Sequence, residues 1–200
     1  AISSAGLSDE SVAQVNSMFH SPDDSAPIMD ETNMPQWLKE AFAEHKPSKE
    51  KLPEWLVVSA VPAIMISKQR LSAQHMEQVL YALTKSTFEV PHPLVEKLRI
   101  GLESRSSDKC VWWLFERWLK SGAPPKDKWA MFATGLLGSD DIALKLTPLI
   151  RQWPGESQHQ RAVVGLECLR QIGSDTALMQ INGIAQKLPF KALKQKAAEC

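Results

Sequence analysis

The block GSDDIALKLTPLIRQWP at residues 138–154 returns 35 residues later as GSDTALMQINGIAQKLP at residues 173–189. Inside each copy the apolar residues follow helical spacing, and both copies end at a proline. A fixed period in the thirties with helical spacing is typical of helical repeat arrays. One helix pair cannot bury its apolar stripe alone, so such repeats stack on their neighbours.

The rest of the chain from residue 67 to residue 200 is also patterned as helices. No segment shows a sustained period of two that would indicate strands. We therefore predict an all-α fold, a HEAT/armadillo-like α-α superhelix of antiparallel helix pairs. The expected helices cover residues 67–86, 91–104, 107–120, 126–137, 139–153, 158–172 and 174–188, with another from 190. Two shorter helices are expected to open at Pro35 and Pro53, because proline is tolerated at a first helical position.

The dipeptide Ser-Asp recurs at residues 107, 139 and 174, each time where a helix is expected to begin. A serine hydroxyl caps backbone N–H groups, and the following acid is favoured by the helix dipole. We predict that Ser139 and Ser174 cap their helices. Gly138 and Gly173 should end the preceding helices, since glycine accepts the left-handed conformation.

The segment from Val111 to Phe115 is apolar on almost every side. A helix of this kind is buried on several sides, so we place it at the centre of the array. The side chains expected to be mostly buried are Trp112, Leu114, Phe115 and Trp118. An aromatic platform for stacking nucleic-acid bases is the functional alternative.

Charge is distributed unevenly although the net charge is zero. Residues 1–45 hold eight acidic and one basic side chain, or −7, which leaves +7 for the remainder. We divide the chain into an acidic N-terminal helical and loop segment, residues 1–50, and a repeat domain, residues 51–200. The acidic segment is either an arm that meets a basic body or a solvated linker. The chain starts without methionine and stops within a helical pattern, so we expect a piece of a longer protein.

Three scattered cysteines, Cys110, Cys168 and Cys200, argue against a disulfide framework. Their odd number favours a reducing compartment. No apolar run in the sequence approaches the length of a membrane helix. No secretory signal opens the chain. We therefore expect a cytoplasmic protein with no membrane partner.

No familiar catalytic signature is present. The sequence lacks a phosphate-binding glycine loop, a His-Glu-x-x-His motif and a Gly-x-Ser-x-Gly motif. Its five histidines are far apart, and none has another histidine or a cysteine three or four residues away. We accordingly expect a protein that is not an enzyme and that holds neither a cofactor nor a metal.

Several stretches resemble one group of bacterial proteins: KDKWA at residues 126–130, LTPLIRQWPGE at 146–156, IGSDTALM at 172–179 and NGIAQK at 182–187. The group comprises large proteins with a C-terminal domain of unknown function. Some carry a WGR domain, and some are labelled regulators of molybdate metabolism. The resemblance covers residues 90–196 well and 53–56 weakly, and it implies a cytoplasmic bacterial protein whose helical repeats precede another domain.

These observations favour a non-catalytic scaffold that binds another protein or other domains of its own chain. Its binding side chains are expected on the second helix of each pair. The candidate residues are Lys145, Gln152, Gln180, Asn182, Gln186 and Lys187. The alternative is a nucleic-acid-binding array, which the lysines at 187, 191, 194 and 196 favour.

Overall fold

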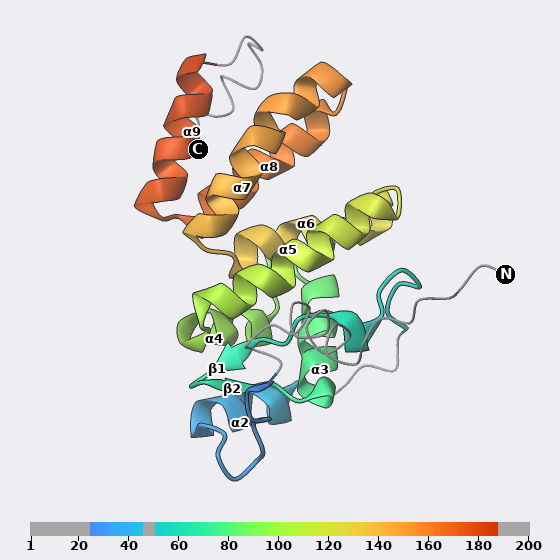
Figure 1. Cartoon of the computed structure of the whole chain (residues 1–200), viewed down its shortest axis with the longest axis vertical. Coiled ribbons are helices and arrows are strands. Elements are labelled where there is room, and N and C mark those ends of the chain that lie inside the picture. Colours follow the sequence, from blue (N-terminus) through green and yellow to red (C-terminus); the bar gives the residue numbers. More distant parts are fainter. Residues whose placement is uncertain (1–24, 46–50, 188–200) are drawn as a thin grey trace, which may run out of the picture.

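The computed structural model describes residues 25–45 and 51–187, and this part of the chain is mostly helical (Figure 1). The α-helices are α2 (Gln36–Glu44), α3 (Ala73–Thr84), α4 (Pro93–Gly101), α5 (Ser104–Lys120), α6 (Trp129–Leu137), α7 (Asp140–Gln152), α8 (His159–Ile172) and α9 (Asp175–Lys187). Short 3-10 turns lie at η2 (Val58–Ala60), η3 (Pro125–Asp127) and η4 (Trp153–Glu156). The helix expected from residue 190 falls outside the described residues.

Helix contacts from α5 onward follow a regular scheme. Helix α5 packs on α6, and α7 packs on α8. In addition α6 contacts α8, and α7 contacts both α5 and α9. Figure 1 shows the α5 and α6 pair crossing the middle of the molecule, with α7, α8 and α9 beyond it. Each of α5, α6 and α7 therefore touches the helix two places further along the chain.

Helices α7 and α9, which carry the two copies of the repeated block, lie side by side and parallel. At their N-terminal ends, Thr176 Oγ1 donates to Asp140 Oδ2 across 2.8 Å. Towards their C-terminal ends, a Cβ added at Gly183 would lie 3.3 Å from Arg151 Nη2. The expectation that the helices containing Leu144 and Met179 stack in parallel is confirmed.

Helix α6, and not α5, is enclosed on all sides. Every residue of α6 is buried, and α6 contacts α3, α4, α5 and α8. Its sequence WAMFATGLL has no charged residue, whereas α5 carries polar residues at both ends. The prediction of burial on α5 is confirmed for Leu114, Phe115 and Trp118. It is wrong for Trp112, which is partly exposed and donates its Nε1–H to Glu116.

Of the two predicted serine caps, one forms and one does not. The N–H of Ala177 donates to Ser174 Oγ across 3.2 Å, so Ser174 caps α9 as expected. Ser139 makes no capping bond, because its hydroxyl donates to Asp108 of α5 instead. Ser107 and Asp108 lie inside α5, which begins three residues before Ser107, at Ser104.

Replacing Ser174 by Ala should lower the free energy of unfolding by about 1 kcal/mol, the usual worth of an N-terminal capping hydroxyl. Chemical denaturation of the two proteins measures the difference. Ser174→Asn is the matched control, because an asparagine oxygen can also cap a helix. Equal losses in the Ala and Asn variants would contradict a capping role.

Three local expectations are wrong. A two-stranded antiparallel hairpin joins β1 (Met65–Ile66) to β2 (Gln69–Arg70), and its turn residues Ser67 and Lys68 both have positive φ. The stretch from Pro53 to Leu56 forms a turn rather than a helix. Gly138 is extended, with φ −81°, and it is required because a Cβ there would collide with the carbonyl oxygen of Thr134. Gly173, by contrast, is left-handed as expected.

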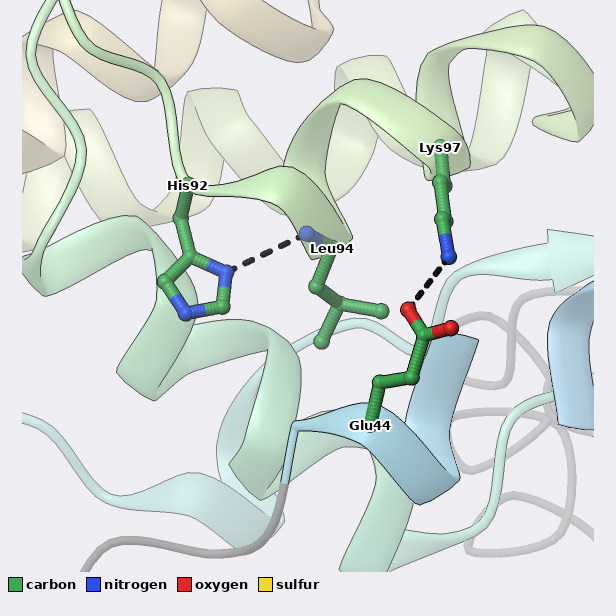
Figure 2. A network of polar contacts seen from close by, with 4 residues as sticks. All are labelled: Glu44, His92, Leu94 and Lys97. Atoms are coloured by element: carbon green, nitrogen blue, oxygen red, sulfur yellow. Dashed lines mark hydrogen bonds and ion pairs between the residues drawn. The ribbon is translucent and has the colours of Figure 1, made fainter. Parts of the chain in front are cut away.

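The N-terminal part of the described chain packs onto the helices. Met29, Leu38 and Phe42 belong to the same apolar core as the later helices. Helix α2 contacts α4, and Figure 2 shows the ion pair between them, with Lys97 Nζ 2.6 Å from Glu44 Oε2. Residues 25–45 are therefore joined to the helical body by apolar packing as well as by this exposed ion pair.

Candidate binding surface

Helix α7 meets a different neighbour on each of its sides. Ile150 is buried against Gly165 of α8, and Ala143 is fully buried as well. The edge towards α5 carries Lys145, whose Nζ lies 5.3 Å from the centre of the Trp112 ring. Leu144 points to neither neighbour and is 51% exposed.

The residues predicted to bind a partner do not form one patch. Lys145 is exposed but faces Trp112 of α5. Gln180 is at the equivalent position on α9, 35 residues later, and is partly buried on the side of α7. Asn182 lies on the far side of α9 from α7 and accepts a hydrogen bond from Gln186 Nε2 across 3.1 Å. Asn182 and Gln186 therefore contact each other, apart from the other predicted residues.

Two further predicted residues lie near helix ends. Gln152 is the last residue of α7, and its Nε2 donates to Glu156. Lys187 is the last residue of α9, and its side chain is outside the described part of the structure. Because α7 packs on α8, which follows it, α7 is the first helix of its pair rather than the second. The expectation that these residues belong to second helices is wrong.

The open side of α7 and α9 carries apolar side chains that sequence reasoning left out. Leu144 and Met179 occupy equivalent positions of the two repeats and are 51% and 72% exposed. Arg151 and Gln186 are exposed one period apart on the same side. We call these four residues the outer strip. Exposed apolar side chains gathered on one side are a feature of interaction surfaces. The signal was available, because both leucine and methionine break the polar side of their helices.

A second candidate is a polar hollow beside α3, with a volume of about 70 Å³. It is lined by His45, Gln78, Tyr81 and His92, among others. Gln78 and Tyr81 are each only 7% exposed, and neither Gln78 Oε1 nor the Tyr81 hydroxyl has a hydrogen-bond partner. His45 Nε2 is likewise buried without a partner. No sequence pattern predicted this hollow, since Gln78 and Tyr81 lie in an otherwise apolar run.

The chemistry of this hollow is limited by His92. Its Nδ1 accepts the N–H of Leu94 across 3.2 Å, as Figure 2 shows, so a neutral ring carries its proton on Nε2. Burial, followed by the neighbouring His45, lowers the pKa of His92. A protonated Nε2 donates a hydrogen bond and does not ligate a metal. The volume has room for water, which would satisfy the buried polar atoms.

No other group of described residues is arranged for metal or thiol chemistry. Within residues 25–45 and 51–187, no three or more His, Cys, Asp or Glu side chains gather closely enough to hold a metal ion. Cys110 and Cys168 are fully buried, as expected, and burial raises the pKa of each thiol to about 12. His75 stacks on Phe42 with ring centres 4.3 Å apart, and burial lowers its pKa.

One curated protein is similar to part of this chain. Over 105 residues, 52% of the chain, the sequence is 37% identical to uncharacterized protein YehI of Escherichia coli (strain K12). The match spans 9% of that protein, so the chain covers less than a tenth of its relative's length. No protein family and no solved structure matches the chain.

Among the described residues, no helix combines the length and the apolar character needed to cross a membrane.

Proposed function

We propose that this chain is a helical-repeat scaffold of the HEAT/armadillo-like kind that binds a protein or another domain of its own polypeptide, without catalysing a reaction. The contact scheme supports the repeat architecture: α5, α7 and α9 touch in one row, and α6 and α8 touch in another. In such arrays each repeat contacts only its neighbours, and the rows leave an extended surface for partners.

The outer strip is the observation that carries the proposed function. Leu144 and Met179 are large apolar side chains at equivalent positions of neighbouring helices, and the described residues leave about half or more of each exposed. Arg151 and Gln186 on the same side can add polar contacts. An apolar centre with a polar border is the usual composition of a protein interface.

The likeness to large bacterial proteins, some labelled regulators, supports a role in the cytoplasm of bacteria, within a regulatory protein. The partial match to an Escherichia coli protein agrees with a bacterial context. We retain nucleic acid as the second candidate partner, because Lys51, Lys85 and Lys126 line one hollow of about 150 Å³.

The experiment is capture of partners from a bacterial lysate, with and without nuclease, by the wild-type chain and by Met179→Asp. We expect a protein that survives nuclease and that the variant captures at least about tenfold less, the effect of losing about 1.4 kcal/mol of binding free energy. Ile100→Asp is the matched control, because Ile100 is 88% exposed on α4, away from the outer strip. Equal capture by all three proteins would contradict the proposal.

Salt dependence separates the two candidate partners. A protein held by the outer strip should bind with little change between about 50 and about 200 mM salt, because the contact is largely apolar. Binding of mixed-sequence RNA or DNA should instead weaken steeply as counterions are released. Micromolar nucleic-acid binding that is lost at the higher salt would overturn the scaffold proposal.

A further inference from the structure

Helix α9 has a side that the described residues leave exposed. The edge of α9 that faces α7 carries Thr176, Gln180 and Gly183, since Thr176 bonds to Asp140 and Gly183 lies against Arg151. At 100° per residue, Leu178 and Asn182 lie on the opposite edge. Leu178 is 49% exposed, and Asn182 is exposed as well.

The same edge of α7 is fully covered. The positions equivalent to Leu178 and Asn182, 35 residues earlier, are Ala143 and Thr147. Ala143 is 0% exposed and Thr147 is 4% exposed, because α9 packs over them. Equivalent edges of the two helices are therefore buried in α7 and exposed in α9.

We propose that this edge of α9 is the docking face for a further helix of the same polypeptide, in a longer form, which lies on α9 as α9 lies on α7. The inference rests on the proposed repeat architecture. Its support is continuity with the α7–α9 interface, together with the length of the similar Escherichia coli protein, of which the matched stretch is only 9%.

The α7–α9 interface also specifies the chemistry of the docking helix. Asp140 accepts from Thr176, and the equivalent acid on α9 is Asp175. The docking helix therefore needs a serine or threonine in its first turn, as a donor to Asp175. Seven residues later it needs a glycine or another small residue, as at Gly183, to lie beside Gln186, which is equivalent to Arg151.

Hydrogen exchange of the α9 backbone amides tests this proposal, because exchange reports local opening of single elements. It is measured in the 200-residue chain and in the full-length polypeptide. We expect α9 amides to exchange at least about tenfold more slowly in the full-length form, the effect of about 1.4 kcal/mol in local opening. Equal exchange in the two forms would overturn the proposal.

Leu178→Asp should abolish the extra protection in the full-length form and leave the 200-residue chain unchanged. Ile100→Asp is the matched control, since Ile100 is 88% exposed on α4 and belongs neither to the docking edge nor to the outer strip. Similar effects of the two substitutions in the full-length form would overturn the inference. Protection of α9 that rises with the concentration of the 200-residue chain would also overturn it, in favour of a second copy as the occupant.

Ala143→Asp distinguishes failure of this inference from failure of the architecture beneath it. It places a carboxylate inside the α7–α9 interface, so α9 should exchange faster in both forms. If Ala143→Asp changes nothing, the stacked repeat is wrong and the proposed function loses its support. If Ala143→Asp acts and Leu178→Asp does not, the repeat stands and only the docking face is wrong.

Discussion

Replacing Trp118 by Ala should lower the free energy of unfolding by about 3–5 kcal/mol, the range for a large aromatic side chain removed from a packed core. Trp118 is only 4% exposed. Its ring centre lies 6.2 Å from that of Phe115, and the guanidinium of Arg161 on α8 lies 5.6 Å from its ring. The substitution therefore empties a space between α5 and α8.

Trp118 also has a polar contact that alanine would lose. Its Nε1–H donates to the carbonyl oxygen of Pro124 across 3.0 Å and so fixes the turn that follows α5. Trp118→Phe keeps one aromatic ring and removes this bond together with part of the buried ring system, at a cost of about 1 kcal/mol or more. Measuring both variants by chemical denaturation gives a graded series, and Trp118→Phe remains measurable if the Ala variant does not fold.

The control for Trp118→Ala is Ile100→Ala on α4. Ile100 is 88% exposed, so the change should stay within about 0.5 kcal/mol. If Trp118→Ala also stayed within that margin, the side chain would not be part of the core, and its contacts with Phe115 and Arg161 would be wrong.

The sequence predicted the helices well where the apolar period and the end signals agree. Helix α8 ends at Ile172, just before Gly173, and Ser174 caps α9, which begins at Asp175. Both signals act within one turn of the chain, so they can be read locally. The repeated block also predicted that α7 lies beside α9, because neighbouring repeats with similar apolar stripes stack on each other.

The errors arose where a distant partner overrides a local preference. Ser139 has the sequence context of a cap, but Asp108 of α5 offers its hydroxyl a stronger, charged acceptor. The hairpin at residues 65–70 turns through Ser67 and Lys68, which are not the asparagine or glycine usual at left-handed positions. No periodicity in the sequence could have supplied either contact.

The candidate site was predicted only in part for a related reason. Single side chains such as Lys145 and Asn182 were chosen by type and helical position, but the neighbours of each helix decide which sides remain open. Lys145 faces Trp112, whereas Asn182 faces no described helix. Leu144 and Met179 were omitted because an apolar residue on a helix is first taken as core. The packing of α7 between α5 and α9 leaves these two side chains exposed.

The link between α5 and the start of α7 leads to the second large prediction. Asp108 is 4% exposed within α5, and its two carboxylate oxygens accept the N–H and the hydroxyl of Ser139, the N–H across 2.7 Å. These two hydrogen bonds attach the connection between α6 and α7 to α5. Asp108→Ala should lower the free energy of unfolding by about 2 kcal/mol, the usual worth of hydrogen bonds to a charged group.

Dependence on pH gives this prediction a second readout. Burial raises the pKa of Asp108 above its ordinary value of 3.8, against the opposing hydrogen bonds from Ser139. The folded protein therefore binds the Asp108 proton more tightly than the unfolded chain does, and Asp108's contribution to stability falls as pH rises from 3.8 through the raised pKa. Asp108→Asn cannot titrate, so the stability difference between wild type and Asp108→Asn should shift in favour of the variant over that window.

Denaturation of the wild type, Asp108→Ala and Asp108→Asn at a pH below 3.8 and at neutral pH measures both effects. Asp141 is the matched control, because it is exposed on α7 and raises the pKa of Asp108 only by its charge. Asp141→Asn should leave the free energy of unfolding within about 0.5 kcal/mol. If Asp108→Ala costs no more than this control, the contact with Ser139 does not hold the layers together, and another interaction must join α5 to the start of α7.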